Sequence, residues 1–447
     1  MQFKLLSTIA EINPRLPEGN YEDDLMVSFI PMANLEAEIG IINLSLEKKY
    51  SQVRKGYTSF IDGDVIFAKI TPCMENGKSG LVQKLKNGIG FGSTEFHVIR
   101  PSQQVLGKYL FYYVVQRSFR NEARKFMTGS AGQLRVPANY LKNILIPLPP
   151  LPEQQRIVAR IEELFSELDN GIQNLKTAQA QLKTYRQAVL KAAFEGKLSE
   201  EWRKNNATDK SNSDLKQKVI TYHQTRASRK KNHDLDVSFE ESYSRNIPVS
   251  WIEIKLKYLS NGVEYGTSDK SEKSGKVPVL RMGNIQNFRF DYSNLVYSNN
   301  DTEIKKYQLH KNDVLFNRTN SPELVGKTAI YKLDKPAIFA GYLIRINQIE
   351  SLINADYLNY FLNSIKAKNY ANEVKTDGVN QSNINGNKLI NYVIPYCSLE
   401  EQNIIVAELE TRLSISDKIE ATINQSLQQA ESLRQSILKQ AFEGNLI

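Results

Sequence analysis

Two stretches of the chain, residues 151–198 and 399–447, carry apolar residues at alternating steps of four and three. This heptad spacing predicts two long helices that pair along a coiled-coil seam. We expect Gly171 to favour a kink in the middle of the first helix, and Arg412 and Ser416 to interrupt the second seam. The predicted seam residues are Ile157, Ile161, Leu164, Leu168, Leu175, Leu182, Ile405, Leu409, Ile419, Ile423, Leu433 and Ile437.

Residues at the ends of both stretches fit helix starts and stops. Pro152 suits the first turn of the first helix, and Ser398 with Glu401 makes a capping-box pattern before the second. Gly196 and Gly444 stand where a left-handed cap would end each helix. These signals predict that each helix is continuous between its cap residues.

The remaining stretches, residues 1–150 and 247–398, have the pattern of mixed strand and helix. A turn followed by the apolar run Val65–Ala68 predicts a buried strand, and Val314–Phe316 repeats that pattern. The polar residues 199–246 predict a connector between the two halves. Amphipathic helices rich in Tyr and Leu are predicted at residues 106–123 and 355–366.

The chain contains an internal repeat. Residues 146–198 align without a gap with residues 394–446, at a constant offset of 248. Weaker matches at nearly the same offset continue upstream, so each copy is a globular part followed by a helical part. The helical parts are alike and the globular parts have diverged. This asymmetry suggests that the helical parts form one shared frame, which carries two globular parts with different recognition properties.

The predicted fold class follows from the internal repeat. Two helices with comparable seams can pair with each other inside one chain. We therefore predict an α+β protein with two repeated mixed α/β domains, separated by two long helices that pair as an antiparallel coiled coil with pseudo-twofold symmetry. The alternative is two separate helices, each packed on its own domain. The predicted boundaries are 1–150 and 247–398 for the domains, 151–198 and 399–447 for the helices, and 199–246 for the connector.

Charge and composition restrict the function. The 447 residues include 58 basic and 49 acidic side chains, a net charge of +9. Residues 1–150 hold 18 basic against 13 acidic groups and residues 251–398 hold 19 against 14, so each region carries +5. Two basic regions favour a polyanionic partner, although two ordinary soluble domains are also compatible with them. No apolar run is long enough to span a membrane, no secretory signal begins the chain, and two cysteines exclude a disulfide framework, so we expect a cytoplasmic protein.

Motifs that would make this chain an enzyme are incomplete. Gly77-Lys78-Ser79 and Gly326-Lys327-Thr328 resemble the end of a phosphate-binding loop, but the required upstream glycine is absent. No catalytic motif of an adenine methyltransferase occurs. Glu253-Ile254-Lys255 has a nuclease-like spacing without a partner aspartate, and the four histidines lack metal-ligand spacing. We therefore expect neither catalysis nor a metal site in this chain.

Candidate nucleic-acid contacts are predicted in both globular parts. Some are basic residues beside the predicted strands, some share a helix face, and some lie in glycine-containing loops. Three other interpretations remain open: hairpins shaped by the Gly-Lys pairs, a solvated helix face, and a turn packed on the helix entry. The candidates are Lys69, Lys78, Arg117, Arg120, Arg124, Gln133, Arg135, Arg318, Lys327, Lys368 and Gln381.

Three motifs resemble the specificity subunit of Type I restriction–modification systems. They are the run Asp64–Lys78, the run Pro147–Val158, and the closing run Phe194–Leu198 with its copy Phe442–Leu446. The order of two copies is itself the architecture of that family, so the resemblance covers essentially the whole chain. It implies two target recognition domains, each reading one half of a split, asymmetric DNA site, and no catalysis in this chain.

The resemblance also implies the partners. Two modification subunits would bind the helical frame and methylate adenine with S-adenosylmethionine, and a restriction subunit would add ATP- and Mg²⁺-dependent translocation and cleavage. We therefore expect double-stranded DNA and these subunits as partners, no membrane, and no cofactor on this chain. Three alternatives remain: the specificity chain of a fused restriction–methylation enzyme, a coiled-coil scaffold that binds DNA without reading sequence, and a nuclease or methyltransferase hidden in a diverged domain.

Overall fold

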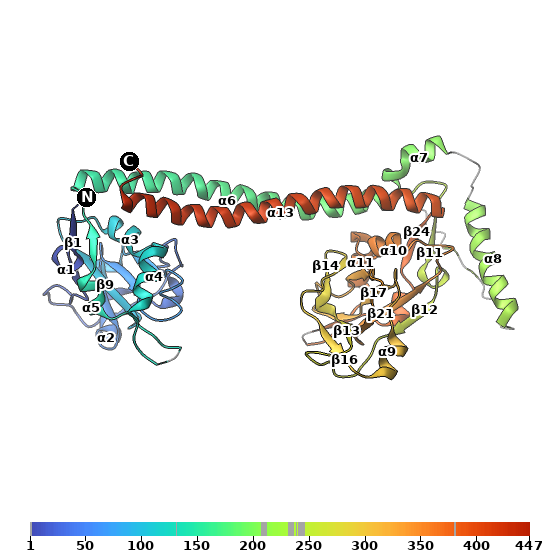
Figure 1. The fold of residues 1–447 in the computed structure, drawn as a ribbon, viewed down its shortest axis with the longest axis horizontal. Coiled ribbons are helices and arrows are strands. Elements are labelled where there is room, and N and C mark those ends of the chain that lie inside the picture. Colours follow the sequence, from blue (N-terminus) through green and yellow to red (C-terminus); the bar gives the residue numbers. More distant parts are fainter. Residues whose placement is uncertain are drawn as a thin grey trace. The chain divides into compact units, whose positions relative to one another are not determined.

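The chain forms two compact units, each with one globular part and a stretch of both long helices (Figure 1). Unit 1 comprises Met1–Thr177 and Thr422–Ile447, and unit 2 comprises Ala178–Ala421. Among the described residues, no helix is long and apolar enough to cross a membrane. The predicted connector lies partly outside the described residues. This computed structural model describes residues 2–130, 132–206, 212–230, 237, 239, 246–379 and 381–447.

The two long helices are α6 (Leu151–Phe194) and α13 (Leu399–Glu443). Both are followed by a glycine in the left-handed region, Gly196 with φ of 72° and Gly444 with φ of 80°. A glycine adopts this conformation at no steric cost, which is why it ends helices so often. Gly171 does not interrupt α6, and its position is open enough that a Cβ there would meet no atom within 4 Å.

The two helices pair within the chain in opposite directions. In unit 1 the beginning of α6 and the end of α13 share one apolar cluster, and in unit 2 the end of α6 and the beginning of α13 share another. Neither helix therefore packs only on its own domain. The pairing residues are Ile157, Ile161, Ile437 and Leu438 in unit 1, and Val189, Leu190, Ile405 and Leu409 in unit 2.

The seam of α13 differs from the prediction at two positions. Ile419 and Leu433 are 45% and 50% exposed, so their assignment to the seam is wrong. Ser416 and Arg434 are buried in the seam instead. The heptad spacing of the seam continues through Ser416 and Arg434. Ile419 and Leu433 therefore lie on another face of the helix.

The seam of α6 is displaced by one residue in part of its length. Phe165 and Arg186 are buried. Their neighbours are less buried: Leu164, a predicted seam residue, is half-buried, and Tyr185 is 42% exposed. The other predicted positions in the middle of α6 are half-buried, namely Leu168, Leu175 and Leu182.

Two ion pairs cross the helix pair at equivalent places of the repeat. In unit 1, Arg434 of α13 donates to the carboxylate of Asp169 on α6. In unit 2, Arg186 of α6 lies 2.6 Å from the carboxylate of Asp417 and 2.8 Å from that of Glu420 on α13. The offset of 248 relates Asp169 to Asp417 and Arg186 to Arg434. Each pair therefore joins the aspartate of one repeat to the arginine of the other.

Unit 1 contains a four-stranded sheet in the order β2-β9-β6-β7, a second in the order β4-β3-β8-β5, and the pair β1-β10. Its strands are β1 Phe3–Leu5, β2 Ala10–Ile12, β3 Met26–Ile30, β4 Glu47–Lys49, β5 Thr58–Ile61, β6 Val65–Ala68, β7 Ser79–Leu81, β8 Ile89–Gly92, β9 Phe96–Pro101 and β10 Leu145–Pro147. Its shorter helices are α1 Leu6–Ile9, α2 Tyr50–Val53, α3 Gly107–Val115, α4 Arg117–Lys125 and α5 Ala138–Asn143.

Unit 2 contains sheets in the orders β12-β21-β17-β19 and β16-β13-β20, the pairs β11-β24 and β14-β15, and the small sheet β18-β23-β22. Its strands are β11 Ile252–Lys255, β12 Ser260–Tyr265, β13 Val277–Leu280, β14 Ile285–Gln286, β15 Arg289–Phe290, β16 Val296–Ser298, β17 Val314–Asn317, β18 Thr319–Asn320, β19 Thr328–Ile330, β20 Ile338–Phe339, β21 Leu343–Gln348, β22 Thr376–Asp377, β23 Ser382–Asn383 and β24 Val393–Tyr396. Its shorter helices are α7 Glu200–Asn205, α8 Asn212–Lys230, α9 Asp301–Tyr307, α10 Ala355–Leu362, α11 Ile365–Val374 and α12 Gly386–Leu389.

The two globular parts have the same core topology. The sheet β2-β9-β6-β7 corresponds to β12-β21-β17-β19, and both are antiparallel throughout. The second sheets correspond as well, since each has one parallel pair, β3 with β8 and β13 with β20. The internal repeat therefore extends through the domains whose sequences have diverged.

Each domain is fixed to the helices by the same buried hydrogen bonds. The fully buried Gln154 donates to the carbonyl oxygens of Gln104 and Pro149 and accepts from the backbone N–H of Leu106. Gln402, its counterpart, makes the same three bonds with Leu352, Cys397 and Asn354. Backbone groups buried in this way cost free energy when they have no partner, so each glutamine holds its helix start on the neighbouring loop.

Each domain also packs on the end of the helix that belongs to the other repeat. The ring of Tyr109 lies 4.9 Å from that of Phe442 at the end of α13. The counterpart Tyr357 lies 5.1 Å from Phe194 at the end of α6. Both tyrosines donate from their hydroxyl to a proline carbonyl on the strand that enters the domain's own long helix, at 2.8 Å and 2.7 Å. Each domain thus contacts both long helices.

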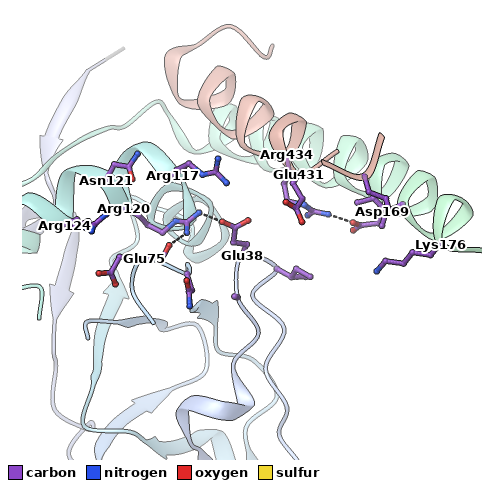
Figure 2. Close-up of a pocket in the computed structure, with 15 residues that line it drawn as sticks. Glu38, Glu75, Arg117, Arg120, Asn121, Arg124, Asp169, Lys176, Glu431 and Arg434 are labelled. Atoms are coloured by element: carbon purple, nitrogen blue, oxygen red, sulfur yellow. Dashed lines mark hydrogen bonds and ion pairs between the residues drawn. The ribbon is translucent and has the colours of Figure 1, made fainter. Parts of the chain in front are cut away.

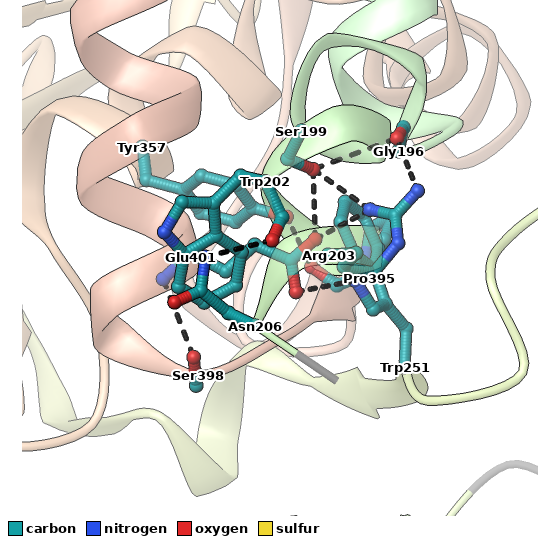
Figure 3. Close-up of polar contacts among 10 residues, drawn as sticks. All are labelled: Gly196, Ser199, Trp202, Arg203, Asn206, Trp251, Tyr357, Pro395, Ser398 and Glu401. Atoms are coloured by element: carbon teal, nitrogen blue, oxygen red, sulfur yellow. Dashed lines mark hydrogen bonds and ion pairs between the residues drawn. The ribbon is translucent and has the colours of Figure 1, made fainter. Parts of the chain in front are cut away.

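A buried carboxylate joins the segment after α6 to the start of α13 in unit 2 (Figure 3). Glu401 is 4% exposed and accepts from the Ser199 hydroxyl at 2.7 Å, from Arg203 at 2.5 Å and from the Trp251 indole at 3.0 Å. The capping box is half formed, since the Glu401 N–H donates to Ser398 Oγ at 3.3 Å. The carboxylate itself takes part in the tertiary contacts.

Replacing Gln154 with leucine should lower the free energy of unfolding by about 3 kcal/mol, because three backbone groups lose their only described side-chain partner. The matched control is Gln155→Leu, at the exposed neighbouring position of the same helix, which should change the free energy by less than about 0.5 kcal/mol. Urea unfolding of the full chain measures both. Equal effects of the two substitutions would contradict the role given to Gln154.

Candidate nucleic-acid interface

A basic residue follows the central strand of the main sheet in each domain. Lys69 comes directly after β6 and Arg318 directly after β17. The backbone of Lys69 accepts from the N–H of Val136, and that of Arg318 accepts from the N–H of Ile384. Both side chains are half-buried, and neither has a carboxylate partner among the described residues. The Arg318 guanidinium lies 4.8 Å from the centre of the Tyr265 ring, which orients it without neutralising it.

In each domain, the loop that precedes this hydrogen-bond donor, Val136 or Ile384, carries an exposed glutamine. Gln133 and Gln381 are both exposed at the tips of their loops. In unit 1 the loop is held to the sheet by His97, whose Nε2 lies 2.8 Å from the carbonyl oxygen of Val136. Burial lowers the pKa of His97, so the neutral ring donates to this carbonyl. A primary amide both donates and accepts, which is the pattern that pairs with the major-groove edge of adenine.

Arg135, on the same loop as Gln133, is neutralised. Its guanidinium makes a two-pronged ion pair with Glu95, with Nη2 at 2.8 Å from Oε1 and Nε at 2.9 Å from Oε2. Hydrogen bonding to Arg135 lowers the pKa of Glu95 below its usual value. The pair holds the loop at the residue that directly precedes β9, and it leaves Gln133 as the exposed polar group of the loop.

The three arginines of α4 do not share one exposed face. Arg117 and Arg124 are exposed, but Arg120 is 4% exposed. Its guanidinium donates to the Glu38 carboxylate and to the backbone carbonyl of Glu75 (Figure 2). The alternative interpretation of this helix as a solvated face is therefore wrong at Arg120, because a carboxylate from a distant loop lies against its guanidinium.

The Gly-Lys pairs also differ between the domains. Gly77 has φ of 73° and Gly326 has φ of 87°, so both shape a turn that other residues rarely adopt. The ammonium group of Lys78 lies 2.8 Å from the Met32 carbonyl oxygen. Lys327 is half-buried, and its ammonium group makes no hydrogen bond or ion pair with the described residues. The interpretation that the Gly-Lys pairs shape hairpins therefore fits both pairs. In addition, the charge of Lys327 has no partner among the described residues.

A groove lies between the domain and the long helices in each unit. In unit 1 it has a volume of about 860 Å³ and is bordered by Arg117, Arg124 and Lys176 (Figure 2). These three side chains have no ion-pair partner in the part of the chain that the structure describes. The groove of unit 2 has a volume of about 520 Å³ and is bordered by Lys183, Lys327 and Lys368. The described residues contain no group of His, Cys, Asp and Glu that could hold a metal ion.

The lysines on the long helices were not among the predicted contacts. Lys176 and Lys183 stand on α6 beside the seam, where a basic residue normally indicates only a solvated helix face. The repeat aligns Lys183 with Glu431, which lines the groove of unit 1. That correspondence was available in the sequence, but only the tertiary structure brings the helix and the domain to one groove.

The chain contains two domains of one topology, each with exposed polar and basic groups on loops at the edge of its main sheet. Known proteins identify the class more closely. The family model described as "Type I restriction modification DNA specificity domain" matches residues 1–177 and 248–429. The chain belongs to this family and is a specificity subunit of a Type I restriction–modification system.

Relatives are similar over almost the whole chain. The Type I restriction enzyme EcoAI specificity subunit of Escherichia coli is 28% identical over 478 residues, covering 96% of this chain and 80% of the relative. The EcoEI specificity subunit, also of Escherichia coli, is 26% identical over 95% of this chain and 80% of the relative.

Solved structures share the fold. A chain from a study of complex assembly and conformational transition of the Type I system has a TM-score of 0.70 at 19% identity, and it covers 99% of this chain and 98% of the other. The HsdS subunit of Thermoanaerobacter tengcongensis has a TM-score of 0.57 at 19% identity, with 99% and 97% covered. Both likenesses concern the fold alone.

Removing the carboxylate that neutralises Arg135 should have a small, pH-dependent cost. Because the pKa of Glu95 is lowered in the folded protein, its stabilisation is present above the ordinary value of 4.5 and is lost as the pH falls. We expect Glu95→Gln to lower the free energy of unfolding by about 1 kcal/mol at pH 7 and to have no effect near pH 3. Urea unfolding at the two pH values measures this.

The control for that experiment is Glu122→Gln, which breaks an exposed ion pair with Lys125 on α4. It should be nearly silent at both pH values, since solvent screens exposed pairs. A Glu95→Gln effect that persists unchanged at low pH would contradict the assigned ion pair.

Proposed function

We propose that this chain is the non-catalytic DNA reader of its complex, in which each domain recognises one half of a bipartite, asymmetric site in double-stranded DNA. In this proposal a pseudo-twofold relation between the two domains would present them in opposite orientations along a duplex. In this proposal the length of α6 and α13 sets the spacer between the half-sites.

One observation carries the proposal: the two domains share their core and their attachment but differ in their loops. The buried glutamines and tyrosines that hold the domains to the helices are the same residues in both copies. In contrast, Lys69 is replaced by Arg318, and the neutralised Arg120 by Lys368. Two different half-sites require domains that are attached in the same way but expose different side chains. Contacts to phosphates position a protein on DNA, whereas contacts to bases specify the sequence.

The chemistry belongs to other subunits in this proposal. Two copies of a modification subunit would bind S-adenosylmethionine and methylate adenine, and a restriction subunit would use ATP and Mg²⁺ for translocation and cleavage. We infer that the modification subunits dock on the long helices. Ile415 and Ile419 support this, since they are 54% and 45% exposed on a face of α13 outside the seam, and exposed aliphatic side chains often mark contact sites. The complex would act in the cytoplasm.

Base-modification sequencing of cells that express this chain with its modification subunit tests the proposal. We expect one new methylated motif made of two specified halves and an unspecified spacer. Gln133→Ala and Gln381→Ala should each relax or abolish specificity in one half only, with a loss of about 1–3 kcal/mol at the affected base. An assembled complex that methylates no new motif would refute the reader function. Cells that express either subunit alone are the control.

The spacer gives a second prediction. Inserting one heptad into both α6 and α13 should lengthen the spacer and leave the two halves unchanged, because the seam keeps its 3.5-residue phase. Inserting the heptad into α6 alone should disrupt pairing and methylation, and serves as the mismatched comparison. A spacer of the original length after the paired insertion would contradict the helices' role in setting it.

A further inference from the structure

The repeat places a pair of cations at equivalent positions of the two domains. Lys78 and Arg120 form the pair in unit 1, and Lys327 and Lys368 form it in unit 2. In unit 1 both charges are satisfied internally. Lys78 is bound by the Met32 carbonyl, and Arg120 is held by the Glu38 carboxylate (Figure 2).

The countercharge of unit 1 has no equivalent in unit 2. The repeat aligns Glu38 with Phe288, and both residues have left-handed backbone conformations, with φ of 63° and 68°. The Phe288 ring packs against Tyr360, with their centres 6.3 Å apart. The Glu38 carboxylate, which neutralises Arg120 in unit 1, is thus replaced by the Phe288 ring at the equivalent position of unit 2.

The lysines of unit 2 consequently lack partners. The ammonium groups of Lys327 and Lys368 make no hydrogen bond or ion pair with the residues that the structure describes. The side chain of Lys183 from α6 borders the same groove and also has no partner among these residues. The pKa of Lys327 is lowered by its burial, and that of Lys368 by burial and by the charge of Lys327. Unpaired charges of the same sign in one groove repel each other, and an anion between them removes that cost.

The acidic residues of the groove do not supply this anion. Glu420 is paired with Arg186 at 2.8 Å. Glu323 is exposed and forms no ion pair with the lysines in the described part of the chain. The groove of about 520 Å³ therefore has an excess of positive charge that the folded chain leaves uncompensated.

We propose that Lys183, Lys327 and Lys368 form a phosphate-binding site, filled by a backbone phosphate of the DNA, and that the first domain has no such site. The inference rests on the proposed function. It makes the two domains unequal: the second adds a sequence-independent contact, whereas the corresponding cation pair of the first domain stabilises the fold. This phosphate fixes the position of the DNA on unit 2 without specifying a base.

The first test neutralises two lysines together. Lys327→Gln with Lys368→Gln should weaken DNA binding about tenfold at 0.15 M salt and reduce the slope of log affinity against log salt by one to two, while the methylated motif stays the same. Lys273→Gln with Lys335→Gln removes the same charge from exposed positions outside the groove and should leave the slope unchanged. Titrations of the assembled complex over a salt series measure both.

The second test keeps the lysines and restores the missing carboxylate. Phe288→Glu should reduce the slope as the lysine variant does, because it supplies the charge that Glu38 supplies in unit 1. Phe288→Gln loses the same ring without adding charge and should keep the wild-type slope. Melting temperatures of both variants separate this effect from misfolding.

The outcomes distinguish the site from the proposed function. Wild-type complex without sequence preference would refute the proposed function. Sequence-specific binding with equal slopes in the wild type, the double lysine variant and Phe288→Glu would overturn the phosphate site. Calorimetry with inorganic pyrophosphate separates the source: tight binding that needs the lysines, with an unchanged DNA slope, would assign the site to a free phosphate compound and overturn the DNA assignment.

Discussion

The antiparallel pairing of α6 with α13 is the constraint on which the rest of the structure depends. Each domain packs on the start of its own long helix and on the end of the other repeat's helix, through Tyr109 with Phe442 and Tyr357 with Phe194. A domain is therefore held correctly only if the two helices run in opposite directions at one register. The repeated sequence makes this possible, because one set of contacts is used twice with the roles of the helices exchanged.

The frame is specified by polar groups as well as by apolar burial. Aliphatic side chains in a heptad pattern accept several registers at similar cost, whereas a buried arginine requires its carboxylate at one place. Arg186 and Arg434 meet this condition at equivalent positions. The buried glutamines do the same for the domains, since each binds three backbone groups. The frame is thus invariant, and the loops around Lys69 and Arg318 are free to differ.

Sequence periodicity predicted the long helices, their pairing and the repeated domains, because heptads and repeats are properties of the chain itself. It failed where the seam uses polar residues. Ser416 was taken as an interruption and the buried Arg434 was not expected in the seam, so Ile419 and Leu433 were placed inside instead. Arg120 was misjudged for another reason. Its partner Glu38 is 82 residues away, and only the folded domain brings the two together. The groove lysine Lys183 was missed because a lysine on a helix surface has no local feature that marks a site.

Reversing one of the crossed ion pairs tests the central claim most directly. Asp169→Arg and Arg434→Asp are made singly and together, and urea unfolding gives the coupling free energy between them. Paired helices in the stated register predict that each single substitution destabilises the protein and that the double variant recovers about 1–2 kcal/mol. Additive effects, with a coupling near zero, would contradict the register and with it the attachment of both domains.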